Sequence, residues 1–304
     1  MKYLNLIRYK NLLIIAITQY LVKYSLIDSY GYISVLSDFE FALGVLSTLL
    51  MAAGGYAIND YFDVNVDRIN KSKTQVVGES IKRSTALAVH LLGTGLSIAI
   101  GWYLVYVTGW WILGIINPLF AVLLWFYSTH FKKMFVVGNL LIAGTTAFTA
   151  IVVVVLFCLA GSIKSPFQEN LLVAYVYTGF AFLASWIREI IKDLEDHVGD
   201  SAMGYDTLAI NFGMEKAVKF TFVLSFLMLA LILFFGFIEF NGSVLALGYI
   251  LILLVLPQTY FMMKLRKAKS IAQFKFLSRL SKAIMIAGVL SLPVFTWLSQ
   301  NAWV

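Results

Sequence analysis

Apolar runs of about 20 residues recur along the whole chain and alternate with short polar connections. As an α-helix, a run of that length spans the hydrocarbon core of a bilayer, because each residue adds about 1.5 Å. Of the 304 residues, 61% are hydrophobic and 13% are charged. An ordinary soluble domain has about 25% charged residues. The sequence therefore predicts an all-α, polytopic membrane protein.

We expect nine transmembrane helices, with turns at Thr108-Gly109 and Asn241-Gly242 closing two tight hairpins. The spans cover residues 11–34, 41–59, 84–107, 110–128, 138–160, 172–192, 217–238, 243–263 and 283–301. If the amino terminus is inside, all but Lys23 and Lys164 of the 23 Lys and Arg residues fall on the cytoplasmic side. This predicts a multi-pass protein, in the cell (inner) membrane if prokaryotic. The net charge of +7 reflects topology and does not indicate nucleic acid.

Two stretches share the spacing Asp-x-x-Asp-x-x-x-Asp, 133 positions apart (193 − 60). Their aspartates are Asp60, Asp63 and Asp67 in the first, and Asp193, Asp196 and Asp200 in the second. On a helix, positions i, i+3 and i+7 lie on one face. A single acidic run is usually a solvated helix end. Two acidic runs with the same spacing, in a chain with only sixteen Asp and Glu residues, favour a functional site instead. Both follow predicted spans on the cytoplasmic side.

Six carboxylates facing one space repel each other unless a cation lies among them. Hard oxygen ligands in this number suit Mg²⁺, which proteins commonly hold with a few carboxylates and substrate phosphates. The two stretches therefore predict a site for Mg²⁺ and a diphosphate, built from two related halves.

The same offset relates the starts of the first four spans to those of the fifth to eighth. We expect one membrane domain made of two four-helix pseudo-repeats, residues 11–136 and 137–265, followed by residues 266–304. That last part comprises the end of a basic segment, 264–282, expected to lie on the membrane as a surface helix, and the ninth span. In such repeats the site lies at their interface. The connections 68–83 and 201–216 are expected to cover it.

Several residues near the acidic stretches could bind the diphosphate. Arg188 lies one turn before Lys192, on the face that leads to Asp196, and Arg68 follows the first stretch. Lys132 closes the fourth span after Tyr127. Each cation could equally be a positive-inside anchor, and Tyr127 an interfacial tyrosine. Asn139 could cap the fifth span or join the site.

The stretch Asn59-Asp60-x-x-Asp63-x-x-x-Asp67 with Arg68-Ile69-Asn70-Lys71 resembles the first motif of UbiA-type intramembrane prenyltransferases. The run from Arg188 to Asp200 resembles the second. The resemblance covers the whole chain, and the second motif is most similar to the digeranylgeranylglyceryl phosphate synthase branch. One departure follows Asn70, where many members have a run with two prolines and an arginine. Here residues 71–76 contain none of the three.

The resemblance implies a role for each motif position. One Mg²⁺ with the diphosphate would be bound by Asn59, Asp60, Asp63 and Asp67, and the other by Asp193, Asp196 and Asp200. Phosphate oxygens would be held by Asn59, Arg68, Lys132, Arg188 and Lys192. Tyr127 would face the reacting carbon and would act in catalysis with Asp63, Asp67, Asp196 and Asp200.

The implied reaction transfers a polyprenyl group, geranylgeranyl being favoured, from its diphosphate to a membrane-associated acceptor, with geranylgeranylglyceryl phosphate favoured. Prenylation of an aromatic quinone precursor, similar to 4-hydroxybenzoate, a naphthoate or homogentisate, is the alternative. A cation-coupled transporter is disfavoured because its charges are expected at mid-span, whereas these lie at helix ends. A phospholipid alcohol phosphotransferase is disfavoured because its single Asp-Gly motif does not appear.

Overall fold

The computed structural model describes residues 1–31, 34–70, 75–159, 169–240 and 243–301. These residues form helices, and the one isolated bridge among them joins Val77 and Ile81. In chain order the helices are α1 (Lys2–Leu6), α2 (Tyr9–Val22), η1 (Lys23–Ile27), η2 (Asp28–Tyr30), α3 (Asp38–Phe62), α4 (Val64–Asn70), α5 (Arg83–Thr108), α6 (Ile112–Thr129), η3 (Phe131–Lys133), α7 (Val137–Ala147), η4 (Phe148–Val152), α8 (Val153–Leu159), α9 (Glu169–Ala202), α10 (Leu208–Asn211), α11 (Met214–Phe240), α12 (Val244–Tyr249), η5 (Ile250–Val255), α13 (Leu256–Leu265) and α14 (Ile271–Asn301).

Seven helices in the described part of the chain are long and apolar enough to cross a membrane, which confirms the polytopic helical class. They are Asp38–Phe62, Arg83–Thr108, Ile112–Thr129, Val137–Leu156, Met214–Ile238, Val244–Leu265 and Ile271–Asn301. The predicted span 11–34 falls mainly on α2, η1 and η2, and the predicted span 172–192 falls on α9. Neither of these two segments is among the seven. The count of nine and the two pseudo-repeats stay predictions.

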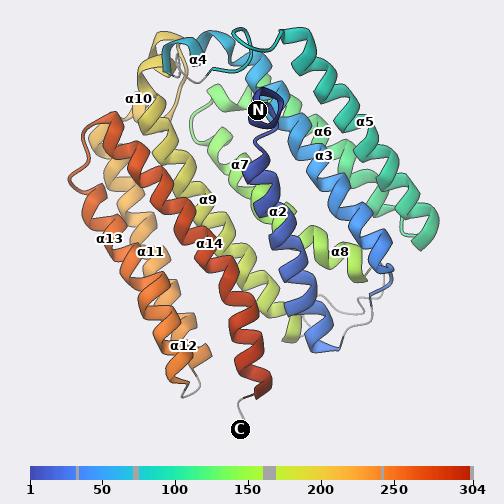
Figure 1. Cartoon of the computed structure of the whole chain (residues 1–304). Helices are drawn as coiled ribbons and strands as arrows, with labels where there is room; N and C mark the ends of the chain where they lie inside the picture. Colours follow the sequence, from blue (N-terminus) through green and yellow to red (C-terminus); the bar gives the residue numbers. More distant parts are fainter. Residues whose placement is uncertain (32–33, 71–74, 160–168, 241–242, 302–304) are drawn as a thin grey trace.

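Helix α9 lies at the centre of the packing. It contacts α7 on one side and α14 on another, while α3 packs along α5 (Figure 1). One apolar cluster, which includes Ile190 and Phe261, joins α9 to α11, α13 and α14. A second, which includes Phe41 and Leu104, joins α2, α3, α5 and α6. This packing fixes the helix that carries the second acidic stretch.

Local sequence signals set the ends of the helices around the site. Helix α3 begins with a capping box: Ser37 Oγ accepts from the Glu40 amide, and the Glu40 carboxylate accepts from the Ser37 amide. Helix α5 ends at Thr108 and is followed by Gly109, whose φ of +71° is in the left-handed region that glycine tolerates best. The predicted turn at Thr108-Gly109 is therefore confirmed. The predicted Asn241-Gly242 turn lies outside the described residues.

The first acidic stretch is divided between two helices. Helix α3 ends at Phe62 and α4 starts at Val64, so Asp63 lies between two helices. The Asp63 amide still donates to the Asn59 carbonyl over 2.9 Å, and the Asp67 amide donates to the Asp63 carbonyl over 2.8 Å. The break therefore redirects the chain while i to i+4 hydrogen bonds continue across it.

The basic segment 264–282 is not a separate surface helix, so this prediction was wrong. Residues from Ile271 onward belong to α14, which continues without a break into the predicted last span. Phe274 and Leu277 are buried in the cluster with α9 and α13 instead of facing lipid. Helix α14 has 31 residues and is about 46 Å long, which exceeds the thickness of the hydrocarbon core. The apolar face of its first turns packs on the protein.

Candidate active site

Both acidic stretches line one cavity of about 1080 Å³. Small-molecule pockets usually measure about 300–1,000 Å³, so this cavity is large. All six motif aspartates contribute to it, and away from them the lining is mainly apolar. Apolar lining residues include Ile14, Phe120, Leu124, Met228, Ile232, Phe235 and Leu254. A cavity with an acidic part and an apolar extension suits a lipid that carries an anionic head group on bound cations.

The first stretch is held by cations and amides from other elements. The Lys132 ammonium, on η3, contacts Asp63 Oδ1, and Asn59 Nδ2 donates to Asp63 Oδ2 over 2.7 Å. Arg8 precedes α2 and its guanidinium contacts Asp60 Oδ1 at 2.9 Å. The same guanidinium lies over the Tyr56 ring, 4.8 Å from its centroid. These contacts fix the carboxylates and balance part of their charge.

The second stretch continues α9 beyond the predicted span 172–192. Asn139, at the start of α7, donates from Nδ2 to Asp193 Oδ2 over 2.8 Å, so it joins the site. Burial raises the pKa of Asp193 to about 8, and the charges of Glu189 and Asp200 add to this rise against the Asn139 hydrogen bond. One turn earlier, Glu189 pairs with two cations, Arg188 and Lys192, each at 3.0 Å.

The two acidic stretches are joined directly. Asn70, the last residue of α4, bonds through its side-chain amide to the α9 backbone at Asp196 and Gly199. Helices α4 and α10 lie at the same end of the molecule (Figure 1), and Tyr205 and Thr207, just before α10, line the cavity. The two connections expected to cover the site thus lie beside it, and their movement as a lid stays a prediction.

The structure brings all but one of the predicted site residues to this cavity. Those that line it are Asn59, Asp60, Asp63, Asp67, Tyr127, Lys132, Arg188, Lys192, Asp193, Asp196 and Asp200. Arg68 does not line it, because its position on α4 leaves the side chain exposed. The departure after Asn70 falls largely on residues 71–74, outside the described residues.

Further polar residues line the cavity that the sequence did not single out for the site, among them Arg8, Asn11, Glu189 and Lys282. Arg8 and Lys282 looked like positive-inside anchors, and Asn11 carried no signal. Glu189 stands within the second motif, between Arg188 and Lys192, and that position was its only signal.

The side chains that line the acidic part of the cavity fit a hard divalent cation, although they are not arranged around one point as metal ligands. The cavity offers carboxylate oxygens from both stretches, the ligands that Mg²⁺ prefers. Within the described ranges, no three Asp, Glu, His or Cys side chains come close enough together to hold a metal ion. Arg8 and Lys132 instead contact two of the carboxylates. The chemistry of the donors therefore agrees with Mg²⁺.

Comparison with known proteins identifies the class. A sequence profile described as the UbiA prenyltransferase family matches residues 24–280. The fold and cavity are thus those of a membrane-embedded prenyltransferase. The chain belongs to the UbiA prenyltransferase family, so the transporter and phosphotransferase alternatives are not supported.

Several curated relatives carry the name digeranylgeranylglyceryl phosphate synthase. The protein of Ignicoccus hospitalis is 34% identical over 198 residues, which cover 62% of this chain but only 60% of that protein. The Saccharolobus solfataricus protein is 33% identical over 71% of each chain. The Sulfolobus acidocaldarius protein is 30% identical over 84% of this chain and 88% of its own.

Solved structures share the fold. One, from work on digeranylgeranylglyceryl phosphate synthase in membranes, superposes with a TM-score of 0.67 at 24% identity and covers 97% of both chains. A UbiA homolog from Archaeoglobus fulgidus bound to GPP and Mg²⁺ superposes with a TM-score of 0.60 at 18% identity. That pair covers 96% of this chain and 99% of the homolog.

Proposed function

We propose that this protein transfers a geranylgeranyl group from its diphosphate to geranylgeranylglyceryl phosphate in a Mg²⁺-dependent reaction. The observation that carries the proposal is the single large cavity, in which six aspartates lie beside an extended apolar lining. The shared name of the curated relatives supports this acceptor. The Mg²⁺ and GPP bound to the Archaeoglobus fulgidus homolog support the metal and a prenyl diphosphate donor.

The acidic part of the cavity would hold the metal and the diphosphate. Mg²⁺ would be held by Asn59, Asp60, Asp63 and Asp67 from the first stretch and by Asp193, Asp196 and Asp200 from the second. When bound, the metal supplies positive charge that stabilises the diphosphate as a leaving group. Lys132, Arg188 and Lys192, with Arg8, supply further positive charge toward the phosphate oxygens. Arg68 would join them only if α4 moves toward the cavity.

The apolar part of the cavity would hold the prenyl chain and exclude water from the reacting carbon. The C–O bond to the diphosphate would break to leave an allylic cation, the acceptor hydroxyl oxygen would bond to that carbon, and the hydroxyl proton would pass to the released diphosphate. Tyr127 lines the same cavity as Asp63 and Asp193. Its ring is therefore suited to face a developing carbocation, which aromatic faces attract.

The proposed topology has nine crossings, two four-helix halves and a cytoplasmic amino terminus in the cell membrane. Helices α2 and α9 supply the two crossings beyond the seven long apolar helices. Figure 1 shows the amino terminus at one end of the bundle and α14 ending at the other, which agrees with an odd number of crossings. The site would then face the cytoplasm.

The test is prenyl transfer by the full chain in nanodiscs, with labelled geranylgeranyl diphosphate and Mg²⁺. The acceptors offered are geranylgeranylglyceryl phosphate and a set of aromatic acids and phenols. We expect transfer to the glycerol phosphate lipid, lost on chelation and in Asp63→Ala and Asp196→Ala. Prenylation of an aromatic acceptor alone would overturn the proposed acceptor, and transfer unaffected by either substitution would overturn the site.

A further inference from the structure

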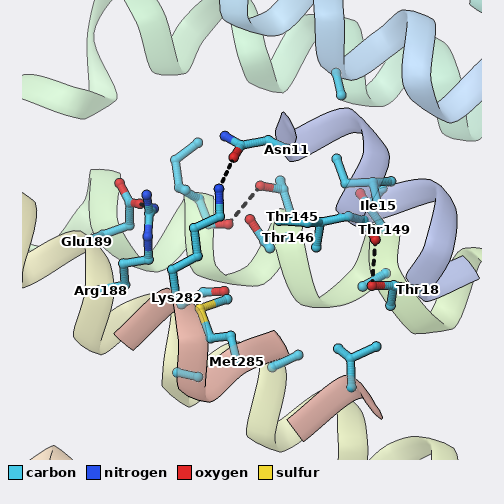
Figure 2. A pocket seen from close by; sticks show the side chains of 18 of the residues that line it. Asn11, Ile15, Thr18, Thr145, Thr146, Thr149, Arg188, Glu189, Lys282 and Met285 are labelled. Atoms are coloured by element: carbon cyan, nitrogen blue, oxygen red, sulfur yellow. Dashed lines mark hydrogen bonds and ion pairs between the residues drawn. The ribbon is translucent and has the colours of Figure 1, made fainter. Parts of the chain in front are cut away.

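Lys282 is a cation that lines the cavity but belongs to neither acidic stretch. It belongs to α14, and its Nζ donates to Asn11 Oδ1 on α2 over 2.5 Å (Figure 2). Helices α2 and α14 contact each other, so both residues lie on a wall formed by the first and last long helices. The half-buried Lys282 therefore brings its charge into the cavity from an element that carries no motif.

Lys282 differs in its partner from the cavity cations that pair with carboxylates. Arg8 pairs with Asp60, Lys132 with Asp63, and Lys192 with Glu189. The partner of Lys282 is a neutral amide, and among the described residues it forms no ion pair with a carboxylate. A partly buried ammonium that lacks a carboxylate is costly unless water or a ligand compensates its charge.

The charged groups around Lys282 add further positive charge to this part of the cavity. The groups whose charges act on it are Arg188 and Lys10, and both are cations. Arg188 pairs with Glu189, yet that single carboxylate is shared with Lys192. Figure 2 shows Lys282 extending toward Asn11, with Arg188 and Glu189 to one side. This wall therefore carries more positive than negative charge and favours an anion.

An unused hydroxyl lies in the same region. Ser185, one turn before Arg188 on α9, lines the cavity and is only 4% exposed. Its Oγ has no hydrogen-bond partner in the described part of the chain. Buried polar groups are normally satisfied, so an unpaired hydroxyl beside a cation suggests a ligand that accepts hydrogen bonds.

We propose that Lys282, with Asn11 and Ser185, binds the phosphate of the acceptor lipid. This assignment rests on the proposed function, in which two phosphate-bearing substrates share one cavity. The donor diphosphate belongs with the aspartates and their metal, so the second phosphate needs a separate cationic place. A lysine provides it as a point charge, and Asn11 and Ser185 can donate hydrogen bonds to phosphate oxygens.

The apolar lining near Lys282 suits the rest of the acceptor. Ile15 on α2 and Met285 on α14 line the cavity beside it (Figure 2). Ile14 and Val289, from the same two helices, extend this apolar surface. The acceptor chain would lie along α2 and α14 while its phosphate meets Lys282. Its free hydroxyl would then point toward the donor at the aspartates.

The experiment compares Lys282→Met with Lys275→Met, which removes an exposed lysine of the same helix that does not line the cavity. Each full-length variant, in nanodiscs, receives geranylgeranylglyceryl phosphate or the same lipid without its phosphate. We expect Lys282→Met to raise the KM for the phosphorylated acceptor about tenfold or more, as loss of a hydrogen bond to a charged group predicts. The KM for the donor changes less than about twofold, and the preference for the phosphorylated acceptor disappears.

A second variant, Asn11→Asp, keeps the lysine and gives it a carboxylate partner. We expect it to raise the acceptor KM as well, while bound labelled donor confirms that each variant is folded. An unchanged acceptor KM, a rise in the donor KM instead, or an equal effect of Lys275→Met would overturn the assignment. If the wild type itself ignores the phosphorylated lipid, the proposed function fails, and that outcome is separate.

Discussion

Asn70 holds the backbone of α9 at two points within the second acidic stretch. Its Nδ2 donates to the Asp196 carbonyl over 2.9 Å, and its Oδ1 accepts from the Gly199 amide over 2.8 Å. A Cβ at position 199 would lie 2.5 Å from the Asn70 side chain, so glycine is required for this approach. The pair fixes the distance between the two acidic stretches.

Gly199→Ala is therefore expected to lower prenyl transfer about tenfold or more, because two hydrogen bonds are worth about 1 kcal/mol each. Gly179→Ala is the matched control, since that glycine is also on α9 and its Cβ would meet no atom within 4 Å. Activity of each variant is measured in nanodiscs. In the double variant Asn70→Ala, Gly199→Ala, the clash is gone, so activity should equal that of Asn70→Ala alone. Full activity of Gly199→Ala would contradict the role of this contact.

The contrast between Arg8 and Arg68 gives a second prediction. Arg8 lines the cavity and pairs with Asp60, whereas the sequence pointed to Arg68, which is exposed and lies outside the cavity. We expect Arg8→Ala to reduce kcat/KM about tenfold or more, as loss of a partly buried charged partner predicts. Arg68→Ala should have a smaller effect. The reverse order would show that α4 turns Arg68 toward the diphosphate.

The contact between Lys132 and Asp63 predicts a link between metal and stability. The two side chains are 7% and 15% exposed, so Lys132→Met leaves a largely buried carboxylate without its cation. Breaking a buried pair costs about 3–5 kcal/mol, so we expect a lower Tm in metal-free detergent solution. Because Mg²⁺ can replace the missing charge, it should raise the Tm more in this variant than in wild type. Lys133→Met, which removes the exposed neighbouring lysine, is the control. A Mg²⁺ response equal in all three proteins would argue against a metal beside Asp63.

The raised pKa of Asp193 predicts pH-dependent metal binding. Burial raises this pKa from 3.8 to about 8, so the metal-free carboxyl holds a proton below about pH 8. A carboxylate must lose its proton to bind a metal, so Mg²⁺ affinity should increase from about pH 6 to about pH 8 and then level off. Titration calorimetry across this range measures it.

Asn139 provides the control for this pH dependence. Its hydrogen bond lowers the pKa of Asp193 against the larger effect of burial. Asn139→Ala should therefore move the rise in affinity to higher pH, and Asp193→Asn should weaken binding and flatten the curve. An affinity that is constant over the same range in wild type would refute a role for this carboxyl in the metal site.

The sequence predicted the features that depend on local pattern. Long apolar runs predicted the helices, and the repeated spacing predicted that the two acidic stretches face one space; Asp63 and Asp196 both line the cavity. A helical face is set by neighbouring residues, so spacing alone is informative there. The break at Asp63 escaped prediction because neither Gly nor Pro marks it.

Contacts between distant segments could not be predicted in this way. Arg8 and Asp60 are 52 positions apart, and Lys282 and Asn11 are 271 apart. A lysine at a cytoplasmic helix end has the same appearance whether it anchors the protein or enters a cavity. Only the packing of α2 on α14 distinguishes the two, and no single stretch of sequence encodes it.

The position of Lys282 on α14, apart from both acidic stretches, has an evolutionary consequence. The aspartates that would bind the metal lie on α3, on α4, at the junction between them and on α9, whereas Lys282, the cation assigned to the acceptor phosphate, lies on the last helix. Substitutions on α14 can therefore alter which molecule is prenylated without disturbing ionisation of the diphosphate. Such a division lets one scaffold diversify its products by changing one helix, and it makes α14 the place to begin when redesigning the enzyme for a new acceptor.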